Sequence, residues 1–185
     1  CEMTEDGSCN LTLGSLDPIN KSAEDHDNGV FLAAMSPTGD WLWSKSYSNP
    51  YQLMVVDLLV TQYDEIHLAL LHRGELTIDN LSSPASVTAE AVALVEMNAQ
   101  GDVSALSTVF SSNALDDTGS LCKDNAGMTY FATSFTDLIV FGQEEINSSG
   151  GLNIAVGQYA DGVWNWVNQA DRKSTRLNSS HLVIS

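Results

Sequence analysis

Basic residues are scarce in this sequence. Seven Lys and Arg stand against 24 Asp and Glu among 185 residues, which gives a formal net charge of −17 at pH 7. Proteins that bind nucleic acid concentrate Lys and Arg to neutralise phosphates, so this composition predicts no nucleic-acid partner. An acidic surface keeps a protein soluble and suits a saline or cation-rich medium.

Long apolar runs and catalytic motifs are also lacking. No run approaches the roughly 20 residues of a membrane-spanning helix, so no transmembrane segment is expected. The chain has no G-x-S-x-G, P-loop, G-x-G-x-x-G or H-E-x-x-H motif and no recognisable Ser/His/Asp arrangement. His67 and His72 are five residues apart in an expected strand, which predicts opposite faces and no shared metal. These absences favour a non-catalytic protein.

Cysteine is rare as well, with only Cys1, Cys9 and Cys122. Their spacing is not that of a metal site. Cys1 and Cys9 would close a short loop in an oxidising compartment and leave Cys122 unpaired. Alternatively, Cys1 is the lipid-attachment residue of a mature lipoprotein. Both interpretations favour an extracytoplasmic location.

The composition changes abruptly at Asp171. Residues 171–185, DRKSTRLNSSHLVIS, contain three of the seven basic residues. Their sequence resembles the translation of a sequencing-library adapter at every position outside a variable index that encodes Leu182 and Val183. We therefore expect native sequence to stop near Ala170, and residues 171–185 to be a non-native tail with no part in the fold.

A repeat with a period of about 62 residues runs through the rest of the chain. The turn glycines Gly39, Gly101 and Gly162 are evenly spaced at this period, and each follows an apolar run and precedes alternating apolar residues. Residues 65–80 align with residues 127–142 at the same offset. A register kept through both halves predicts a repeat architecture over residues 29–170. Residues 1–28 are acidic and have little periodicity, so they are expected to be an extension or linker.

Each copy predicts short strands, because β-branched and aromatic residues alternate between Gly, Asn, Asp and Ser clusters. The first copy predicts strands near residues 30–36, 41–47, 55–62 and 66–72, followed by 75–79. Residues 88–99 include helix-favouring types, but they align with the strand that begins at Val30 and are expected to be strand. Four strands per period are typical of a β-propeller blade. The predicted fold is all-β, a partial β-propeller of about two and a half to three four-stranded blades.

A family resemblance agrees with this fold. Residues 130–170 are similar to the bacterial and archaeal β-propeller repeats of the SBBP type, through Ser134-Phe135, Phe141-Gly142, the Ser148–Gly151 run, Gly162 and Trp166. Ala33, Thr38-Gly39 and Trp43 resemble the tryptophan-docking motif of quinoprotein-like propellers. The middle copy departs from the pattern, since it has Val103 and Ala105 in place of tryptophans. The resemblance implies a propeller; those typically close with 4–8 blades.

Two tryptophan pairs recur, Trp41 with Trp43 and Trp164 with Trp166. Residues i and i+2 share one face of a regular strand, so each pair is expected on one side of its sheet. Stacking on a sugar is one interpretation. Packing between adjacent blades is favoured, because a repeat needs the same packing at every interface. The expected structural residues of the repeat are Gly39, Trp41, Trp43, Gly101, Gly142, Gly162, Trp164 and Trp166.

An acidic stretch, residues 22–29, is the candidate metal site. Asp25, Asp27 and Asn28 supply oxygen ligands of the kind that Ca²⁺ prefers, although the downstream Glu of an EF-hand loop is missing. The alternative is a solvated acidic loop. Calcium is therefore the one candidate cofactor.

The expected function is a non-catalytic, extracytoplasmic β-propeller scaffold or interaction module with a protein or glycan partner. Two alternatives stay open. One is a fragment of a quinoprotein-like oxidoreductase or glycan-active propeller enzyme, with its functional residues on other blades. The other is an outer-membrane assembly scaffold like the lipoprotein propellers, which depends on Cys1 alone.

Overall fold

The computed structural model describes residues 2–3, 9–21, 28–85, 87–111, 115–148 and 151–170. Within these ranges the fold is all-β, with antiparallel sheets and no helix. The strands are β1 (Glu2–Met3), β2 (Cys9–Leu11), β3 (Ile19–Lys21), β4 (Asn28–Met35), β5 (Trp41–Asn49), β6 (Gln52–Val60), β7 (Ile66–Arg73), β8 (Leu76–Ile78), β9 (Leu81–Ser83), β10 (Glu90–Met97), β11 (Val103–Ser111), β12 (Leu115–Lys123), β13 (Thr129–Phe135), β14 (Leu138–Phe141), β15 (Glu144–Asn147), β16 (Asn153–Ala160) and β17 (Val163–Ala170).

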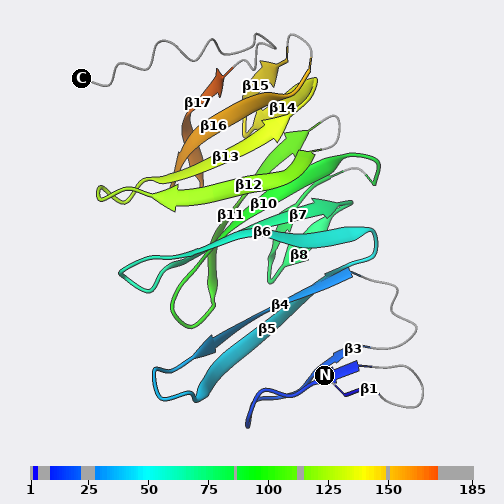
Figure 1. Cartoon of the computed structure of the whole chain (residues 1–185), viewed down its shortest axis with the longest axis vertical. Coiled ribbons are helices and arrows are strands. Elements are labelled where there is room, and N and C mark those ends of the chain that lie inside the picture. Colours follow the sequence, from blue (N-terminus) through cyan, green and yellow to red (C-terminus); the bar gives the residue numbers. More distant parts are fainter. Residues whose placement is uncertain are drawn as a thin grey trace, which may run out of the picture.

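The sheets form a stack (Figure 1). The first layer contains the β4–β5 hairpin, with the β8–β9 hairpin beside it. The middle sheet has the order β15-β14-β11-β10-β7-β6, and the end sheet has the order β12-β13-β16-β17. The small β1-β2-β3 sheet lies beyond the first layer, on the side away from the middle sheet (Figure 1).

The middle sheet is buried on both faces. Its central strands β7 and β10 are nearly continuous apolar runs, as expected of strands covered on two sides. One hydrophobic cluster, which includes Leu71, Leu94 and Phe131, lies between the middle and end sheets. A second, which includes Leu70 and Val95 and against which Leu32 packs, lies between the first layer and the middle sheet. Burial on both faces outweighs the helix propensity of residues 88–99, and the prediction of a strand there is confirmed.

Sheet membership differs from the expected four-stranded sheet per period. β4 and β5 pair with each other, whereas β6 and β7 join β10 and β11 in the middle sheet. The chain changes layer across Pro50 and Tyr51, between β5 and β6. Proline has no N–H and cannot continue the ladder. The buried Asn49 side chain holds this corner, since its Oδ1 accepts from the N–H of Tyr51 at 2.9 Å and its Nδ2 donates to Glu75 O at 3.0 Å.

Four long hairpins end in the same five-residue turn. The N–H of the first residue donates to the carbonyl of the fifth, and the N–H of the fourth donates to the carbonyl of the first. The fourth residue has positive φ, which glycine adopts at little cost. The turns begin at Ser36, Thr61, Asn98 and Asp124, and their fourth residues are Gly39, Asp64, Gly101 and Gly127.

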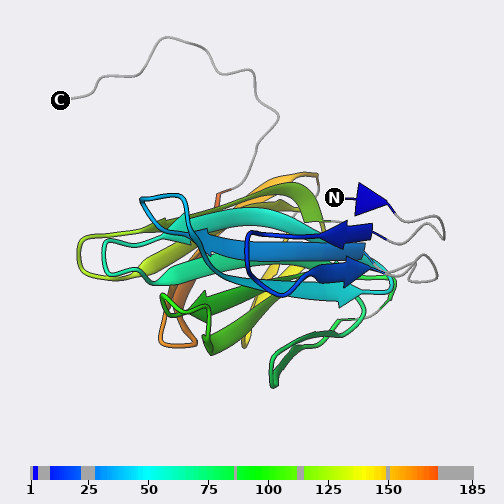
Figure 2. The same cartoon turned by 90° about the horizontal axis from the view of Figure 1, so that it is seen from below.

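These turns gather at one end of the strands, on the left of both Figure 1 and Figure 2. Gly162 lies instead in the two-residue turn between β16 and β17, where it and Asp161 both have positive φ. Gly142 begins the turn between β14 and β15, also with positive φ. The expected turn positions of Gly39, Gly101 and Gly162 are therefore confirmed.

Candidate functional site

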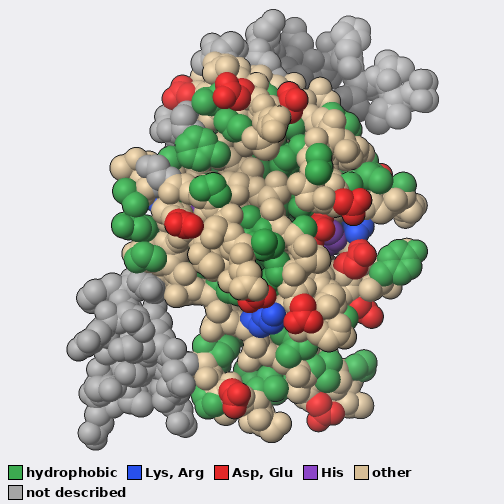
Figure 3. Space-filling model, turned by 180° about the vertical axis from the view of Figure 1, so that it is seen from behind, with side chains coloured by type: hydrophobic (Ala, Val, Ile, Leu, Met, Phe, Trp, Pro, Cys, Tyr) green, Lys and Arg blue, Asp and Glu red, His purple; other side chains and the backbone are tan. Residues whose placement is uncertain are grey.

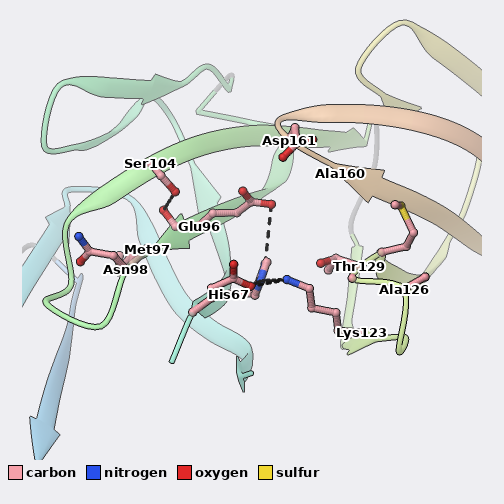
Figure 4. Close-up of a pocket in the computed structure, with 13 residues that line it drawn as sticks. His67, Glu96, Met97, Asn98, Ser104, Lys123, Ala126, Thr129, Ala160 and Asp161 are labelled. Carbon is pink, nitrogen blue, oxygen red and sulfur yellow. Dashed lines mark hydrogen bonds and ion pairs between the residues drawn. The ribbon is translucent and has the colours of Figure 1, made fainter. Parts of the chain in front are cut away.

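A cavity of about 410 Å³ opens between the middle and end sheets, at the end of the strands where the turns gather. His67 and Glu96 reach it from β7 and β10 of the middle sheet, and Lys123 from the end of β12 (Figure 4). Glu65, the last residue of the turn before β7, and Asp161, in the turn after β16, complete its charged lining. The cavity therefore brings together titratable side chains from the middle sheet and the end sheet.

Lys123 is the centre of this charged cluster. Its Nζ donates to Glu65 Oε2 at 2.5 Å and approaches His67 Nε2 at 3.2 Å. An ammonium group only donates, so Nε2 of a neutral His67 ring accepts and the ring proton lies on Nδ1. His67 Nδ1 is 3.8 Å from Glu96 Oε1, on the other side of the ring. Figure 4 shows His67 between the Lys123 ammonium and the Glu96 carboxylate.

The surroundings shift the pKa values of these groups in different directions. Burial, and then the charge of Lys123, lower the pKa of His67 below its ordinary value. Burial raises the pKa of Glu96, although Lys123 opposes this. The hydrogen bond from Lys123 is the main reason that the pKa of Glu65 is lowered. At neutral pH the cluster therefore holds a neutral imidazole between the Lys123 ammonium and the Glu96 carboxyl group.

The geometry suits cross-linking of two sheets and binding of a small polar or cationic group. Three carboxylates, on Glu65, Glu96 and Asp161, face one ammonium in the cavity, so its charge is negative. Among the described residues no three His, Cys, Asp or Glu side chains are arranged to hold a metal ion. Figure 3 shows acidic side chains distributed over one face of the molecule, with few basic ones.

Replacing Lys123 is expected to raise the pKa of His67. In Lys123→Met the positive charge is lost while the ring stays buried, so protonation becomes easier. Because the folded state favours the neutral ring, the contribution of His67 to stability decreases as pH falls below 6.5, and this decrease is smaller in the variant. NMR titration of the His67 ring protons measures the shift. Lys45→Met is the matched control, because Lys45 pairs with Asp79 and Asp102 instead. An unchanged or lower His67 pKa in Lys123→Met would show that the Lys123 charge does not lower the pKa of His67.

The two members of each tryptophan pair lie on opposite faces, contrary to the expectation of a shared face. Trp164 packs in the cluster between the middle and end sheets. Trp166 lies on the other face of the end sheet, where its ring centroid is 6.0 Å from that of Tyr130 and the residue is 38% exposed. Trp43 packs toward the middle sheet, while Trp41 packs on Gly14 of the β2–β3 turn.

A β-bulge causes the reversal. Register shifts occur between Ala34 and Met35, and between Gln158 and Tyr159, so that three residues of β5 or β17 oppose two residues of the partner strand. The extra residue breaks the two-residue alternation of side chains. The β10–β11 pair has the same irregularity, between Glu96 and Met97. Three hairpins thus have the bulge at the same place.

Glycines make room for the rings. A Cβ on Gly142 would lie 3.0 Å from Trp164 Cδ1, and one on Gly157 would lie 2.6 Å from Trp164 Cζ3. A Cβ on Gly101 would likewise lie 3.0 Å from the Trp43 ring, whose Nε1 donates to Ala99 O at 2.8 Å. The expectation that the tryptophans pack between layers is met by Trp41, Trp43 and Trp164, and Trp166 is left partly exposed.

The calcium candidates Asp25 and Asp27 lie outside the described residues. Asn28 begins β4, and its Nδ2 donates to Tyr51 O at 2.9 Å. His67 and His72 occupy separate environments, as expected, since His72 is buried with its ring nitrogens 2.9 Å from Gly74 O and 2.8 Å from Ser83 Oγ. Cys122 is a free, exposed thiol, and Cys1 lies outside the described residues together with the side chain of Cys9.

Sequence reasoning missed the charged cluster. Lys123 is 56 residues from His67, and no local motif links them. The four turns do have a sequence pattern. Each begins with Ser, Thr, Asn or Asp, and Gly or Asp follows three positions later. This pattern predicts that Glu65 and Lys123 lie beside turns, but it does not predict that these turns lie close together in space.

No protein-family model, curated protein or solved structure matches this chain. Across the part of the chain that the structure describes, no helix is long and apolar enough to cross a membrane.

Proposed function

We propose that this chain is a segment of a non-catalytic, extracytoplasmic repeat scaffold of the β-propeller type, which presents its surface to a protein or glycan partner. The proposal includes the SBBP-type resemblance and takes each stacked layer as one blade. The blade then has up to six strands, drawn from two neighbouring repeats, in place of the expected four. The observation that carries the proposal is the recurrence of strands and buried faces along the chain.

The strand positions support a repeat. β4 and β10 begin one period apart, at Asn28 and Glu90, and β8 and β14 begin at the same spacing. β6 and β12 keep this spacing to within a single position, and the turns that follow them begin at Thr61 and Asp124. Equivalent strands therefore recur in the same order along the chain.

The buried faces recur at the same period. Val30 and Leu32 on β4 pack against the middle sheet. Their counterparts one period later, Val92 and Leu94 on β10, pack against the end sheet. Equivalent faces therefore bury each other in head-to-tail order, as in a repeat protein.

The chemistry of the cavity supports a scaffold more than an enzyme. Lys123 is engaged by Glu65 and His67, so its ammonium is held in contacts between strands. The net charge of −17 supports the extracytoplasmic part of the proposal, since an acidic surface suits a saline medium.

Redox and glycan assays test this proposal. Protein incubated with a redox quinone and Ca²⁺ is expected to reduce no dye in the presence of alcohols or aldoses. Soluble starch and xylan are expected to show no new reducing ends, and slower migration of the protein in gels containing either one would support a glycan partner. Dye reduction that depends on quinone and Ca²⁺, or release of reducing ends, would overturn the non-catalytic proposal. Buffer without protein, and heat-denatured protein, are the controls.

A further inference from the structure

Three central rows of uncharged side chains cross the outer face of the end sheet, and the carboxylates of Asp57 and Asp124 lie at their margin, where they accept from Ser120 Oγ and the Tyr130 hydroxyl. Phe131 and Ala155 face the core, so their neighbours Tyr130, Ala132, Ile154 and Val156 face outward. The strand register places these outward residues in three rows across the sheet. The rows are Cys122, Tyr130, Gln158 and Trp166; Ser120, Ala132, Val156 and Asn168; and Ser134, Ile154 and Ala170. None of these side chains is charged, in a chain whose net charge is −17.

The same face is buried in the two layers before it. On β4, Val30 and Leu32 pack against the middle sheet. On β10, their counterparts one period later, Val92 and Leu94, pack against the end sheet and are 2% and 3% exposed. Ile154 and Val156 of β16 are the next counterparts, one period after Val92 and Leu94, and Ile154 is 45% exposed. The third copy of this face therefore lacks the cover that the first two have.

The first layer has the complementary face, which the β1-β2-β3 sheet covers at Trp41 and leaves exposed along β4. Phe31 and Met35 on β4 point away from the middle sheet and are 54% and 49% exposed. Their counterparts one period later, Ala93 and Met97, are buried against the first layer. The first layer, beside its contact with the β1-β2-β3 sheet, and the end sheet thus each expose part of a face that the other layers bury against a neighbour of the opposite kind.

We propose that these two faces bind each other between copies of the chain, with the outer face of the end sheet of one copy on the outer face of β4 and β5 of a second copy. The proposal rests on the head-to-tail repeat of the proposed function. The contact between copies would be equivalent to the contacts between neighbouring layers within one chain. Trp166 takes the role of Trp43, whose Nε1 donates to Ala99 O of the next layer.

The contacts of the glycine turns fit the same arrangement. Gly142 of the β14–β15 hairpin packs on Trp164, and Gly14 of the β2–β3 turn packs on Trp41 in the same way, with 3.0 Å between the glycine's Cβ position and Cδ1 of the ring in both. The β14–β15 hairpin belongs to the middle sheet, on which the end sheet is stacked, and lies beside β11. In the proposed assembly the β1-β2-β3 sheet of the second copy lies beside β17 of the first. That edge of β17 has no partner strand among the described residues.

This contact is heterologous, so it generates a ring if the rotation closes and a filament if it does not. The net charge of each copy opposes association, while the central rows of the end sheet's outer face are uncharged and carboxylates lie only at their margin. Assembly is therefore expected to strengthen between ionic strengths of about 0.15 M and about 1 M, where the screening length falls from about 8 Å to about 3 Å.

Analytical ultracentrifugation of the full chain under reducing conditions tests the proposal. The wild-type protein is expected to form larger species as its concentration and the salt concentration rise. Ile154→Asp blocks one face and Phe31→Asp blocks the other, so each variant alone is expected to stay monomeric. An equimolar mixture of the two is expected to form a 1:1 dimer and no larger species, because each copy retains one functional face. Tyr63→Asp, at a turn residue that is 74% exposed, is the matched control and is expected to assemble like the wild type.

Two results would overturn the inference. A wild-type protein that stays monomeric at every concentration and salt level has no such contact. Assembly that Ile154→Asp abolishes and Phe31→Asp leaves unchanged means that two end sheets meet face to face. Circular dichroism and thermal melting establish that each variant is folded. A monomeric protein without quinone-dependent activity would overturn this inference and leave the non-catalytic scaffold in place, whereas quinone-dependent activity in an assembling protein would do the reverse.

Discussion

Trp164→Ala is expected to lower the free energy of unfolding by about 3–5 kcal/mol, and Trp166→Ala by about 1 kcal/mol. Trp164 is packed edge-on against Phe141, with ring centroids 4.7 Å apart, and lies 5.2 Å from the Tyr159 ring. Its Nε1 donates to Ser107 Oγ at 3.0 Å. Removing the ring leaves a cavity between two sheets and an unpaired hydroxyl. Trp166 lies on the outer face and is already partly in water.

Urea unfolding followed by far-ultraviolet circular dichroism measures both losses, at a protein concentration low enough to keep the chain monomeric. The two variants are controls for each other, because both remove one tryptophan from the same strand. Equal losses would contradict the β-bulge, since they would place both rings in the same surroundings.

Local alternation was sufficient to predict the strands. The expected strands at residues 30–36, 41–47 and 66–72 correspond to β4, β5 and β7 within two residues at each end. Apolar residues at every second position, bounded by residues suited to turns, determine these elements through short-range sterics and burial. All-β character therefore followed from the sequence.

The direction of the tryptophan side chains could not be predicted from spacing alone. An i, i+2 pair shares a face only if the ladder is regular, and a bulge depends on which residues of the partner strand are opposite. Met35 lies opposite Trp41, and Ala34 lies opposite Trp43, so one residue of β5 is extra. This register is a property of two strands and their packing, which a single strand does not encode.

Sheet membership and the charged cluster were unpredictable for a related reason. A hairpin is local, but the choice between two neighbouring sheets depends on contacts far along the chain. The corner at Asn49 and the contact of β6 with β12 are of this kind. Lys123 contacts His67 only because β7 belongs to the middle sheet and β12 to the end sheet that is stacked on it.

Glu90→Ala is expected to lower the free energy of unfolding by about 2–4 kcal/mol, because it leaves the buried N–H of Leu115 without an acceptor and removes the partner of the half-exposed Arg73 guanidinium. Glu90 is 6% exposed at the start of β10. Its Oε1 is 2.7 Å from Arg73 Nη2 on β7, and its Oε2 accepts from the N–H of Leu115, at the start of β12, at 2.7 Å. One carboxylate thus joins two strands of the middle sheet to the first strand of the end sheet.

Glu90→Gln separates the two contacts of this carboxylate. The amide oxygen can still accept from the Leu115 N–H, while the charge that pairs with Arg73 is lost. We therefore expect Glu90→Gln to cost about half as much as Glu90→Ala, since a buried N–H left unsatisfied has its own cost of about 1–3 kcal/mol. Arg73 also has a buried Nε without a hydrogen-bond partner, so its guanidinium depends on Glu90 for compensation. Urea unfolding at neutral pH measures both values. A loss within about 0.5 kcal/mol for Glu90→Ala, as at an ordinary surface site, would show that the carboxylate does not link the two sheets.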